Sequence, residues 1–317
     1  MNIESINPSS AIEAIKRRAT VRVYSETSCL KLLGLEDKFA ARADWKKRLK
    51  RSITDDERKT LDTIREEIGR RLASELDEAK VEFQRRNKID SYFPDHGPLR
   101  RHNYPKHMEV IGHTRDNSEV LMMSANKVGK SQLGAYCVTC WTTGRYPKWW
   151  HGYRIEEPII AWICNKTAKD CRDINEAELL GPTGNESERG TGMLPGHLIG
   201  KCTPKQGTPN AFEFIHVEHI SGGTSYIVTK SYDQGRTAFQ GRNIPVIWDD
   251  EEVPKDIAGE QKLRIMTVSG RILYTYTPID GLTEFTAEFM EDAGLSLDAL
   301  RQQVTRDHDA DLEEELA

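Results

Sequence analysis

The residues with the most recognisable chemistry are Gly129, Lys130 and Ser131, which follow the apolar run at residues 120–123. An apolar strand that runs into a Gly-Lys-Ser turn and then into a helix is typical of a phosphate-binding loop. In such a loop, backbone N–H groups face the phosphates, the lysine supplies a positive charge between the β- and γ-phosphates, and the serine hydroxyl is a ligand of Mg²⁺. Ser124 stands where the general pattern has its first glycine. An ordinary structural turn is therefore the competing interpretation.

A second stretch with chemical potential is the acidic cluster Asp249-Asp250-Glu251-Glu252, which follows an apolar run beginning at Ile244. In an ATPase, a strand of this kind lies beside the phosphate-binding loop. One Asp holds the hydrated metal, and the next Glu orients and deprotonates the attacking water. A strand that runs into an acidic surface turn is common on its own. The two stretches together favour an ATP-hydrolysing enzyme, in which they meet around one triphosphate at neighbouring strand tips.

Composition limits the class of protein. The chain has 317 residues, of which 37% are hydrophobic and 30% are charged, so it has enough apolar content for one large domain or two ordinary ones. Its net charge of −5 argues against a protein coated in basic surface, but leaves a local DNA-binding patch open. The sequence contains no apolar run long enough for a membrane span, and its polar start has no signal-peptide core.

Cysteine and histidine residues give no metal signature. The six cysteines are scattered through the chain, and we expect free thiols. Cys137 and Cys140 have the spacing of a metal-binding or redox pair, but no second pair accompanies them, so packing inside a helix is the preferred interpretation. His216 and His219 alternate with Val217 on an expected strand, and we interpret both as structural.

Apolar periodicity predicts alternating strands and helices, which indicates a layered α/β domain with a mostly parallel sheet. Nucleotide would bind at the carboxyl ends of its strands. Segments 92–112 and 181–209 are rich in residues that interrupt regular structure. We expect the first to be a domain boundary or an irregular loop and the second to be a long loop with little regular structure. The expected strands are 120–123, 158–164, 212–220, 225–231, 244–249 and 271–276, and the expected helices are 132–142, 167–180 and 256–268.

Three segments follow from these patterns. Residues 1–92 are expected to form a charged helical N-terminal segment, residues 93–290 the ATPase domain, and residues 291–317 an acidic, flexible tail. The basic run at residues 46–51 either touches DNA or is a solvated helix face. The sequence does not settle what the N-terminal helices do.

Six ordered motifs resemble the ATPase part of the large terminase subunit of tailed bacteriophages, the motor that packs double-stranded DNA into capsids. Together they cover the chain between residues 93 and 290. The motifs are GPLRRHNYPKH at 97–107, ANKVGKS at 125–131, GRYPKWW at 144–150, SYDQGR at 231–236, WDDEE at 248–252 and TYTPIDG at 275–281. The resemblance implies a P-loop NTPase fold of the RecA/ASCE-like kind, with a mostly parallel sheet flanked by helices and preceded by a helical segment.

The same resemblance implies roles for individual residues. Lys130 would bind phosphate, Ser131 and Asp250 would hold Mg²⁺, and Glu251 would activate water. Thr275 and Thr277 would sense the γ-phosphate and pass its loss to a domain interface. Tyr104 and His107 would lie on the adenine side, with simple loop packing as an open alternative. The other nucleotide contacts are expected from Ser124, Asn126, Lys127, Val128, Gly129 and Gln132.

Charged residues near the site raise two further points. In ring motors, an Arg from a neighbouring subunit completes the catalytic site. Arg236 and Arg242 are the candidates here. For both, the alternative is an ordinary surface arginine, and this alternative is stronger for Arg242 than for Arg236. Lys127 replaces an Arg that is common in this branch of the family, and a lysine offers charge without the planar bidentate fork.

The function implied by the resemblance is ATP hydrolysis with Mg²⁺, coupled to translocation of double-stranded DNA. The implied partners are a portal protein, a small terminase subunit and further copies of this chain in a ring. The location would be the host cell cytoplasm, transiently on the capsid precursor, with no membrane. The family's usual C-terminal nuclease is not expected in this sequence, so the nuclease is either a separate chain or missing from a truncated motor. A helicase-type or other DNA-dependent ATPase and a non-catalytic assembly or docking protein stay open as alternatives.

Overall fold

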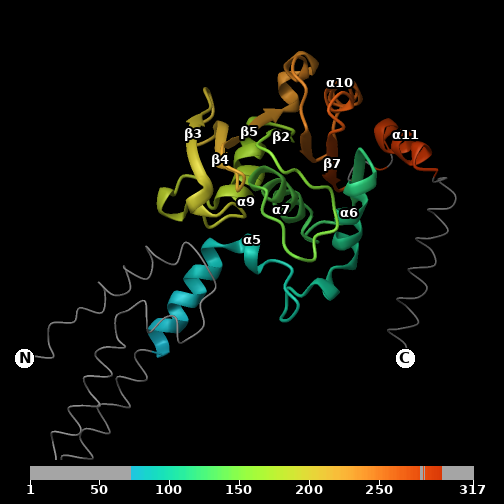
Figure 1. Cartoon of the computed structure of the whole chain (residues 1–317). Coiled ribbons are helices and arrows are strands. Elements are labelled where there is room, and N and C mark those ends of the chain that lie inside the picture. The colour runs from blue at the N-terminus through green and yellow to red at the C-terminus, as the bar shows by residue number, and fades with distance from the viewer. Residues whose placement is uncertain (1–72, 279–280, 282, 295–317) are drawn as a thin grey trace, which may run out of the picture. The chain divides into compact units, whose positions relative to one another are not determined.

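The computed structural model describes residues 73–278, 281 and 283–294 (Figure 1). The chain divides into two units between Arg86 and Asn87, a little before the boundary expected at residue 92. In the first unit, residues 73–86 are helical. The expectations for residues 1–72 and for the acidic tail at 295–317, including the basic run at 46–51, lie outside the described residues.

The second unit is built on a sheet whose seven described strands have the order β1-β7-β6-β2-β5-β4-β3. The first five strands in this order are parallel, and β4 and β3 continue the sheet in antiparallel fashion. Figure 1 shows β3 at one end of the sheet and helix α11 beyond β7 at the other. The strands are β1 (Glu119–Met123), β2 (Ile160–Asn165), β3 (Ile199–Pro204), β4 (Phe212–Glu218), β5 (Thr224–Ser231), β6 (Val246–Asp250) and β7 (Arg271–Tyr276).

Strand β6 explains how helices come to cover both faces of the sheet. All five of its residues are buried, as expected for a parallel strand in the middle of an α/β sheet. Val246 and Trp248 point into the core that contains α7 (Lys130–Thr143), whereas Ile247 points into the core that contains α10 (Lys255–Met266) and α11 (Glu284–Asp292). Because side chains alternate along a strand, α7 and α10 lie on opposite faces.

Helix α7 lies close to the sheet because one of its residues has no side chain. A Cβ atom at Gly134 would lie 2.1 Å from the Trp248 indole, so only glycine fits there. Cys137 and Cys140 are free thiols buried in the same helix, which confirms the prediction of core packing. Within the described residues, no helix is long and apolar enough to cross a membrane.

The fold prediction of a mostly parallel α/β sheet flanked by helices is confirmed, but two local expectations are wrong. Residues 105–116 form helix α6 (Pro105–Asp116) where an irregular segment was expected, because Pro105 occupies the first turn, where a missing N–H costs nothing. Strand β3 lies inside the segment 181–209 that was expected to be a loop.

A third expectation, that of one continuous helix at 167–180, needs a refinement. The helix forms in three parts, α8 (Ala168–Asp170), a π-helical turn (Cys171–Glu176) and α9 (Ala177–Leu180). Thr167 caps the first part, since its side chain accepts a hydrogen bond from the N–H of Asp170 at 3.1 Å.

Candidate nucleotide site

The loop that is expected to bind phosphate, called the phosphate-binding loop below, connects β1 to α7. Gly129 has a φ of +86° and occupies the N-cap position of α7, so the chain turns into the helix through a conformation that glycine adopts without strain. Lys127 also has a positive φ, of +66°. Helix α7 is buried along most of its length, and this packing fixes the position of its N-terminus. The loop therefore places backbone N–H groups and a helix N-terminus at one spot, which is the arrangement that binds anions.

Lys130 directs its ammonium group into this loop. Its Nζ donates to the carbonyl oxygens of Ser124 at 3.1 Å and Ala125 at 2.6 Å, and to Oγ1 of Thr277 at 2.8 Å. Burial lowers the pKa of Lys130, while the carboxylates of Glu251 and Asp250 act in the opposite direction. The lysine thus brings the phosphate-binding loop into contact with the end of β7.

Asp250 meets the loop from the other side. Its Oδ1 accepts hydrogen bonds from Ser131 Oγ at 3.1 Å and from Thr275 Oγ1 at 2.8 Å. Burial raises the pKa of Asp250 to about 6, and these hydrogen bonds oppose the rise. The expected meeting of the loop and the acidic cluster is therefore present. The strand before the loop, β1, and the strand before the acidic cluster, β6, were expected to be neighbours. This expectation is wrong, because β7 lies between them, and Thr275 of β7 contacts Asp250.

Glu251 is the first residue after β6 and has an unusual backbone conformation. Its φ is +105°, a left-handed value that residues with side chains rarely adopt. Its N–H donates to the carbonyl oxygen of Thr275 at 2.9 Å. Its Oε2 lies 3.6 Å from Nζ of Lys166, which follows the last residue of β2. Glu251 thus stands at the same edge of the sheet as Asp250 and the loop.

The two threonines of β7 and the segment after it have different surroundings. Thr275 is fully buried, and its hydroxyl accepts from Trp248 Nε1 at 2.8 Å while contacting Asp250. Thr277 donates to Oδ1 of Asn126 at 2.8 Å and accepts from Lys130. Thr277 therefore contacts the loop directly, whereas Thr275 contacts it only through Asp250.

The residues expected on the adenine side pack under and beside the loop. His107 is buried with its ring against the backbone of Val128 and Gly129, and burial lowers its pKa. A Cβ atom at Gly129 would lie 3.4 Å from Nε2 of His107. Tyr104 packs edge-on against His107 with ring centroids 5.3 Å apart. Gln132 accepts a hydrogen bond from the hydroxyl of Tyr92 at 2.6 Å.

The side chains at the site fit a magnesium ion. Mg²⁺ binds through oxygen atoms, and in nucleotide sites one or two protein ligands are usual because substrate phosphates and water supply the rest. The Ser131 hydroxyl and the Asp250 carboxylate, 3.1 Å apart, form such a pair. Among the described residues, no group of three or more His, Cys, Asp and Glu side chains is placed to hold a metal.

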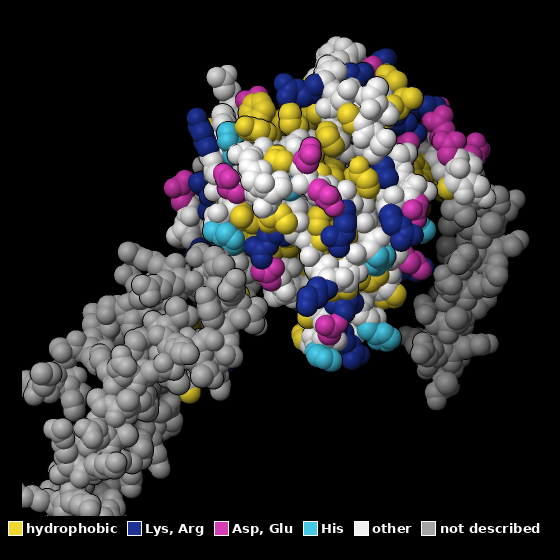
Figure 2. Space-filling model, in the orientation of Figure 1, with side chains coloured by type: hydrophobic (Ala, Val, Ile, Leu, Met, Phe, Trp, Pro, Cys, Tyr) yellow, Lys and Arg dark blue, Asp and Glu magenta, His cyan; other side chains and the backbone are white. Residues whose placement is uncertain are grey.

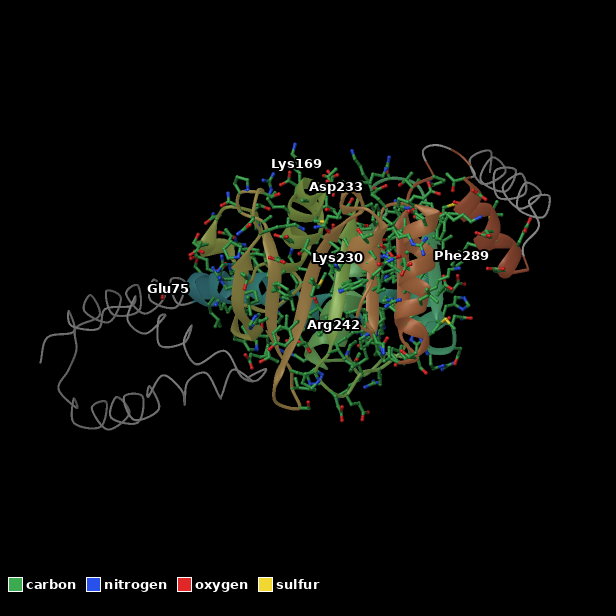
Figure 3. The ribbon with its side chains drawn as sticks, turned by 90° about the horizontal axis from the view of Figure 1, so that it is seen from above. Glu75, Lys169, Lys230, Asp233, Arg242 and Phe289 are labelled. Carbon is green, nitrogen blue, oxygen red and sulfur yellow. The ribbon has the colours of Figure 1, made fainter. Side chains whose placement is uncertain are left out.

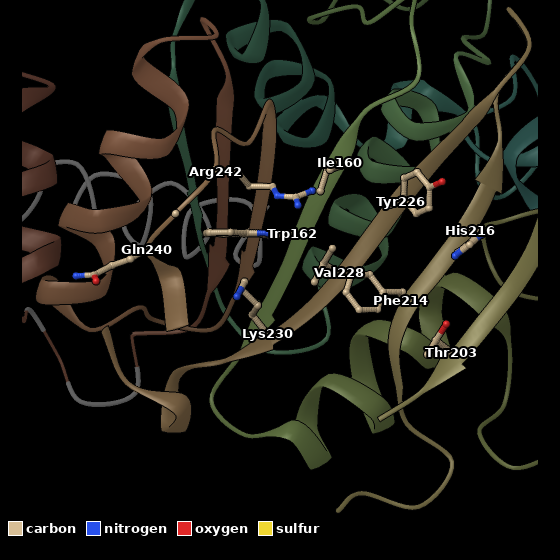
Figure 4. Close-up of a pocket in the computed structure, with 11 residues that line it drawn as sticks. Ile160, Trp162, Thr203, Phe214, His216, Tyr226, Val228, Lys230, Gln240 and Arg242 are labelled. Atoms are coloured by element: carbon tan, nitrogen blue, oxygen red, sulfur yellow. The ribbon is translucent and has the colours of Figure 1, made fainter. Parts of the chain in front are cut away.

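The two arginine candidates lie in different places. Arg236 donates to Oε1 of the buried Glu260 on α10, at 2.8 Å from its Nε and 2.5 Å from its Nη2. Arg242 lines a pocket of about 570 Å³ over β2, β5 and β4, together with Ile160 and Lys230 (Figure 4). Figure 3 shows Arg242 away from the edge that carries Lys169 and Asp233, which follow the carboxyl ends of β2 and β5. In this chain neither arginine contacts Asp250 or Glu251.

Charge is mixed over the surface. In Figure 2, positive and negative side chains are interspersed across the face in view. This distribution agrees with the small net charge of −5.

Sequence reasoning missed two residues beside Glu251. Lys166 follows β2, the strand next to β6, and pairs with the Glu251 carboxylate. Tyr232 follows β5, and its hydroxyl lies 3.0 Å from Oδ1 of Asp249 and 3.1 Å from the carbonyl oxygen of Glu251. Two signals were available, since Tyr232 lies in the motif at 231–236 and both residues follow parallel strands, whose carboxyl ends gather at the same edge of the sheet.

Asp249 leads to a prediction about pH. Burial raises the pKa of Asp249 to about 7. The folded chain therefore keeps a proton that the unfolded chain releases above about pH 4. The contribution of the Asp249 proton to the free energy of unfolding is fully present below about pH 4 and is lost as the pH rises to about 7. Relative to the wild type, Asp249→Asn should gain on the order of 2 kcal/mol in free energy of unfolding between pH 5 and pH 8. Urea denaturation of both proteins measures this, and an equal difference at the two pH values would contradict it.

A mostly parallel sheet with this loop after β1 and this acidic turn after β6 defines the class as an α/β protein of the P-loop nucleotide-binding fold. Residues 121–313 match the family described as "Terminase large subunit, T4likevirus-type, N-terminal". This match covers more than half of the chain, and the chain belongs to that family. The resemblance seen in the sequence motifs is thereby confirmed.

Individual relatives extend this finding. The large terminase subunit of Salmonella phage P22 is 30% identical in an alignment 210 positions long, which covers 61% of this chain and 42% of the P22 protein. The matched region thus spans less than half the length of that relative. Two solved structures of large terminase from a thermophilic bacteriophage align with 54% of this chain and 38% of theirs at 12% identity. The TM-scores are 0.39 for one crystal form and 0.38 for a second, which is a complex with ADP.

Proposed function

We propose that this chain is an ATP-hydrolysing motor that drives double-stranded DNA into phage capsids. Membership of the large terminase family supports the proposal. The observation that carries it is the 3.1 Å hydrogen bond from Ser131 to Asp250, which joins the phosphate-binding loop to the acidic cluster across 119 residues of sequence. This contact brings Ser131 and Asp250 together beside Lys130, and these are the three residues proposed to bind a triphosphate and its metal.

The proposed mechanism assigns a task to each group. Lys130 exchanges its contacts with the loop carbonyls and Thr277 for phosphate oxygens. Ser131 and Asp250 would hold Mg²⁺, which would supply positive charge to the β- and γ-phosphate oxygens when bound. Glu251 orients a water molecule and takes its proton. Thr277 contacts both Lys130 and Asn126, so loss of the γ-phosphate changes the contacts at the end of β7.

The proposal extends to partners. The DNA substrate, the portal protein, the small terminase subunit, a ring of identical chains and a place in the host cell on the capsid precursor are proposed from the family resemblance. In such a ring, Arg236 or Arg242 is proposed to complete the site of a neighbouring subunit. Lys127, with its positive φ on the loop, is proposed to add positive charge near the phosphates.

Thermal unfolding with and without nucleotide tests the binding part of the proposal. A ligand that binds only the folded chain, at one hundred times its Kd, adds about 2.7 kcal/mol of stability, which raises the midpoint by about 4 °C for a chain of this size. We expect this shift with Mg·ATP and a smaller one with ATP in EDTA. No shift at millimolar Mg·ATP would favour the non-catalytic docking protein instead.

A second experiment separates the motor from other DNA-dependent ATPases. Duplex DNA should stimulate ATP turnover, and empty capsids should fill with DNA when the chain and its partners are supplied. Strand separation on forked DNA without packaging would favour a helicase-type ATPase and contradict the motor.

A further inference from the structure

The backbone of Glu251 needs support from its neighbours. A non-glycine residue with a φ of +105° carries a cost of about 1–3 kcal/mol, and persists only where the surrounding structure fixes it. Two hydrogen bonds to the Glu251 backbone hold it in this conformation. The N–H of Glu251 donates to Thr275 on β7 at 2.9 Å, and its carbonyl oxygen accepts from the hydroxyl of Tyr232 at 3.1 Å. The direction in which the Glu251 side chain leaves the backbone therefore depends on these two contacts.

The Tyr232 hydroxyl is itself held in place. The Tyr232 ring is only 7% exposed and packs in the same core as Phe239 and Ile247. Its hydroxyl also lies 3.0 Å from Oδ1 of Asp249, so its single proton is shared between this oxygen and the Glu251 carbonyl oxygen. Oδ1 of Asp249 accepts from Nε2 of Gln261 on α10 at 2.8 Å. The hydroxyl is thus fixed from the buried side and reaches outward to the Glu251 peptide.

We propose that Tyr232 is a positioning residue for Glu251, which holds the strained peptide so that the carboxylate faces the attacking water. This inference rests on the proposed function, because it takes Glu251 as the general base. Tyr232 does not touch the nucleotide in this proposal and acts only through Glu251. Misplacement of a catalytic group by about 1 Å costs about a hundredfold in rate. The loss of one of two fixing contacts is expected to cost about tenfold to a hundredfold.

The substitution Tyr232→Phe tests the inference, because it keeps the ring and removes only the hydroxyl. We expect kcat for ATP hydrolysis to fall about tenfold to a hundredfold, while the Kd for Mg·ATP stays within about twofold. Tyr226→Phe on β5 is the matched control, since Tyr226 is 36% exposed and packs edge-on against His216, on the opposite face of β5 from the buried Ile227. That control should keep wild-type turnover. Equal turnover in Tyr232→Phe and wild type would overturn the inference.

A double variant shows whether Tyr232 acts through Glu251. If it does, Tyr232→Phe combined with Glu251→Gln should hydrolyse ATP no more slowly than Glu251→Gln alone. Additive losses would overturn the positioning role. Wild-type turnover in Glu251→Gln would instead overturn the proposed function, so the two failures are distinguishable.

Hydrogen exchange gives a readout that does not depend on turnover. In the folded Tyr232→Phe variant, the backbone amides of residues 251–253 should exchange faster than in the wild type, while those of β2 should not change. Unchanged exchange at residues 251–253 would overturn the inference even if the variant were slow for another reason.

Discussion

Replacing Glu251 with Gln is expected to lower ATP turnover by about 10²–10⁴-fold and to leave Mg·ATP binding within about twofold of wild type. The amide keeps the shape of the side chain but cannot take a proton from water. Binding should survive because the contacts expected to hold phosphate and metal come from Lys130, Ser131 and Asp250. Single-turnover hydrolysis and thermal shift with Mg·ATP, measured on the same preparation, separate the two effects.

Glu252→Gln is the matched control for this experiment. The same change is made one residue further on, at a carboxylate that accepts hydrogen bonds from Thr283 and Thr286 rather than from the nucleotide site. An amide oxygen still accepts from both hydroxyls, so turnover should stay close to wild type. If Glu251→Gln and Glu252→Gln are equally active, Glu251 is not the base.

Removal of the Lys130 ammonium group is the second change that is expected to have a large effect on nucleotide binding and turnover. Lys130→Ala should abolish the thermal shift with Mg·ATP and reduce turnover to background, because no other described side chain places a cation inside the loop against Ser124, Ala125 and Thr277. In related P-loop enzymes this lysine binds the β- and γ-phosphates. Isothermal titration with Mg·ADP and with a non-hydrolysable ATP analogue provides the measurement.

Lys201→Ala controls for the loss of a lysine as such. Lys201 is exposed on β3, which lies at the opposite end of the sheet from β1 and the loop. That variant should bind and hydrolyse ATP like the wild type. Retention of the Mg·ATP shift in Lys130→Ala would show that nucleotide binds elsewhere or not through this loop.

The local part of the site could be predicted from sequence because its chemistry lies in short, continuous stretches. Gly129, Lys130 and Ser131 follow one another, and a loop between an apolar strand and a helix needs no distant information. The acidic residues after β6 are equally local. That the two stretches meet followed from a general rule of parallel sheets, which gathers the carboxyl ends of strands at one edge.

Long-range order was beyond sequence reasoning for a physical reason. Strand order depends on which hydrophobic faces pack together, and neighbouring apolar runs such as β1, β6 and β7 are interchangeable by composition. The intervening position of β7 therefore appeared only in the structure. Strand β3 was missed because none of its residues is fully buried and it contains Gly200 and Pro204, so it lacks an apolar pattern.

The supporting residues were hardest to predict. Tyr232 and Lys166 follow β5 and β2, and nothing in their immediate sequence points toward Glu251. Helix α6 was not predicted because a proline usually indicates a loop or turn. Pro105 is nevertheless favourable in the first turn of a helix.

The planar peptide bond between Glu251 and Glu252 links two residues whose carboxylates have different partners. On one side, the Glu251 carboxylate lies near Lys166. On the other, the Glu252 carboxylate accepts a hydrogen bond from Thr286 at 3.0 Å, in the first turn of α11. A trans peptide holds the Cα atoms of these two residues about 3.8 Å apart, so displacement of this short piece of backbone would move both carboxylates. The proposed catalytic carboxylate and the first turn of α11 are thus attached to adjacent residues, so movement of α11 would be transmitted to Glu251 through the backbone alone.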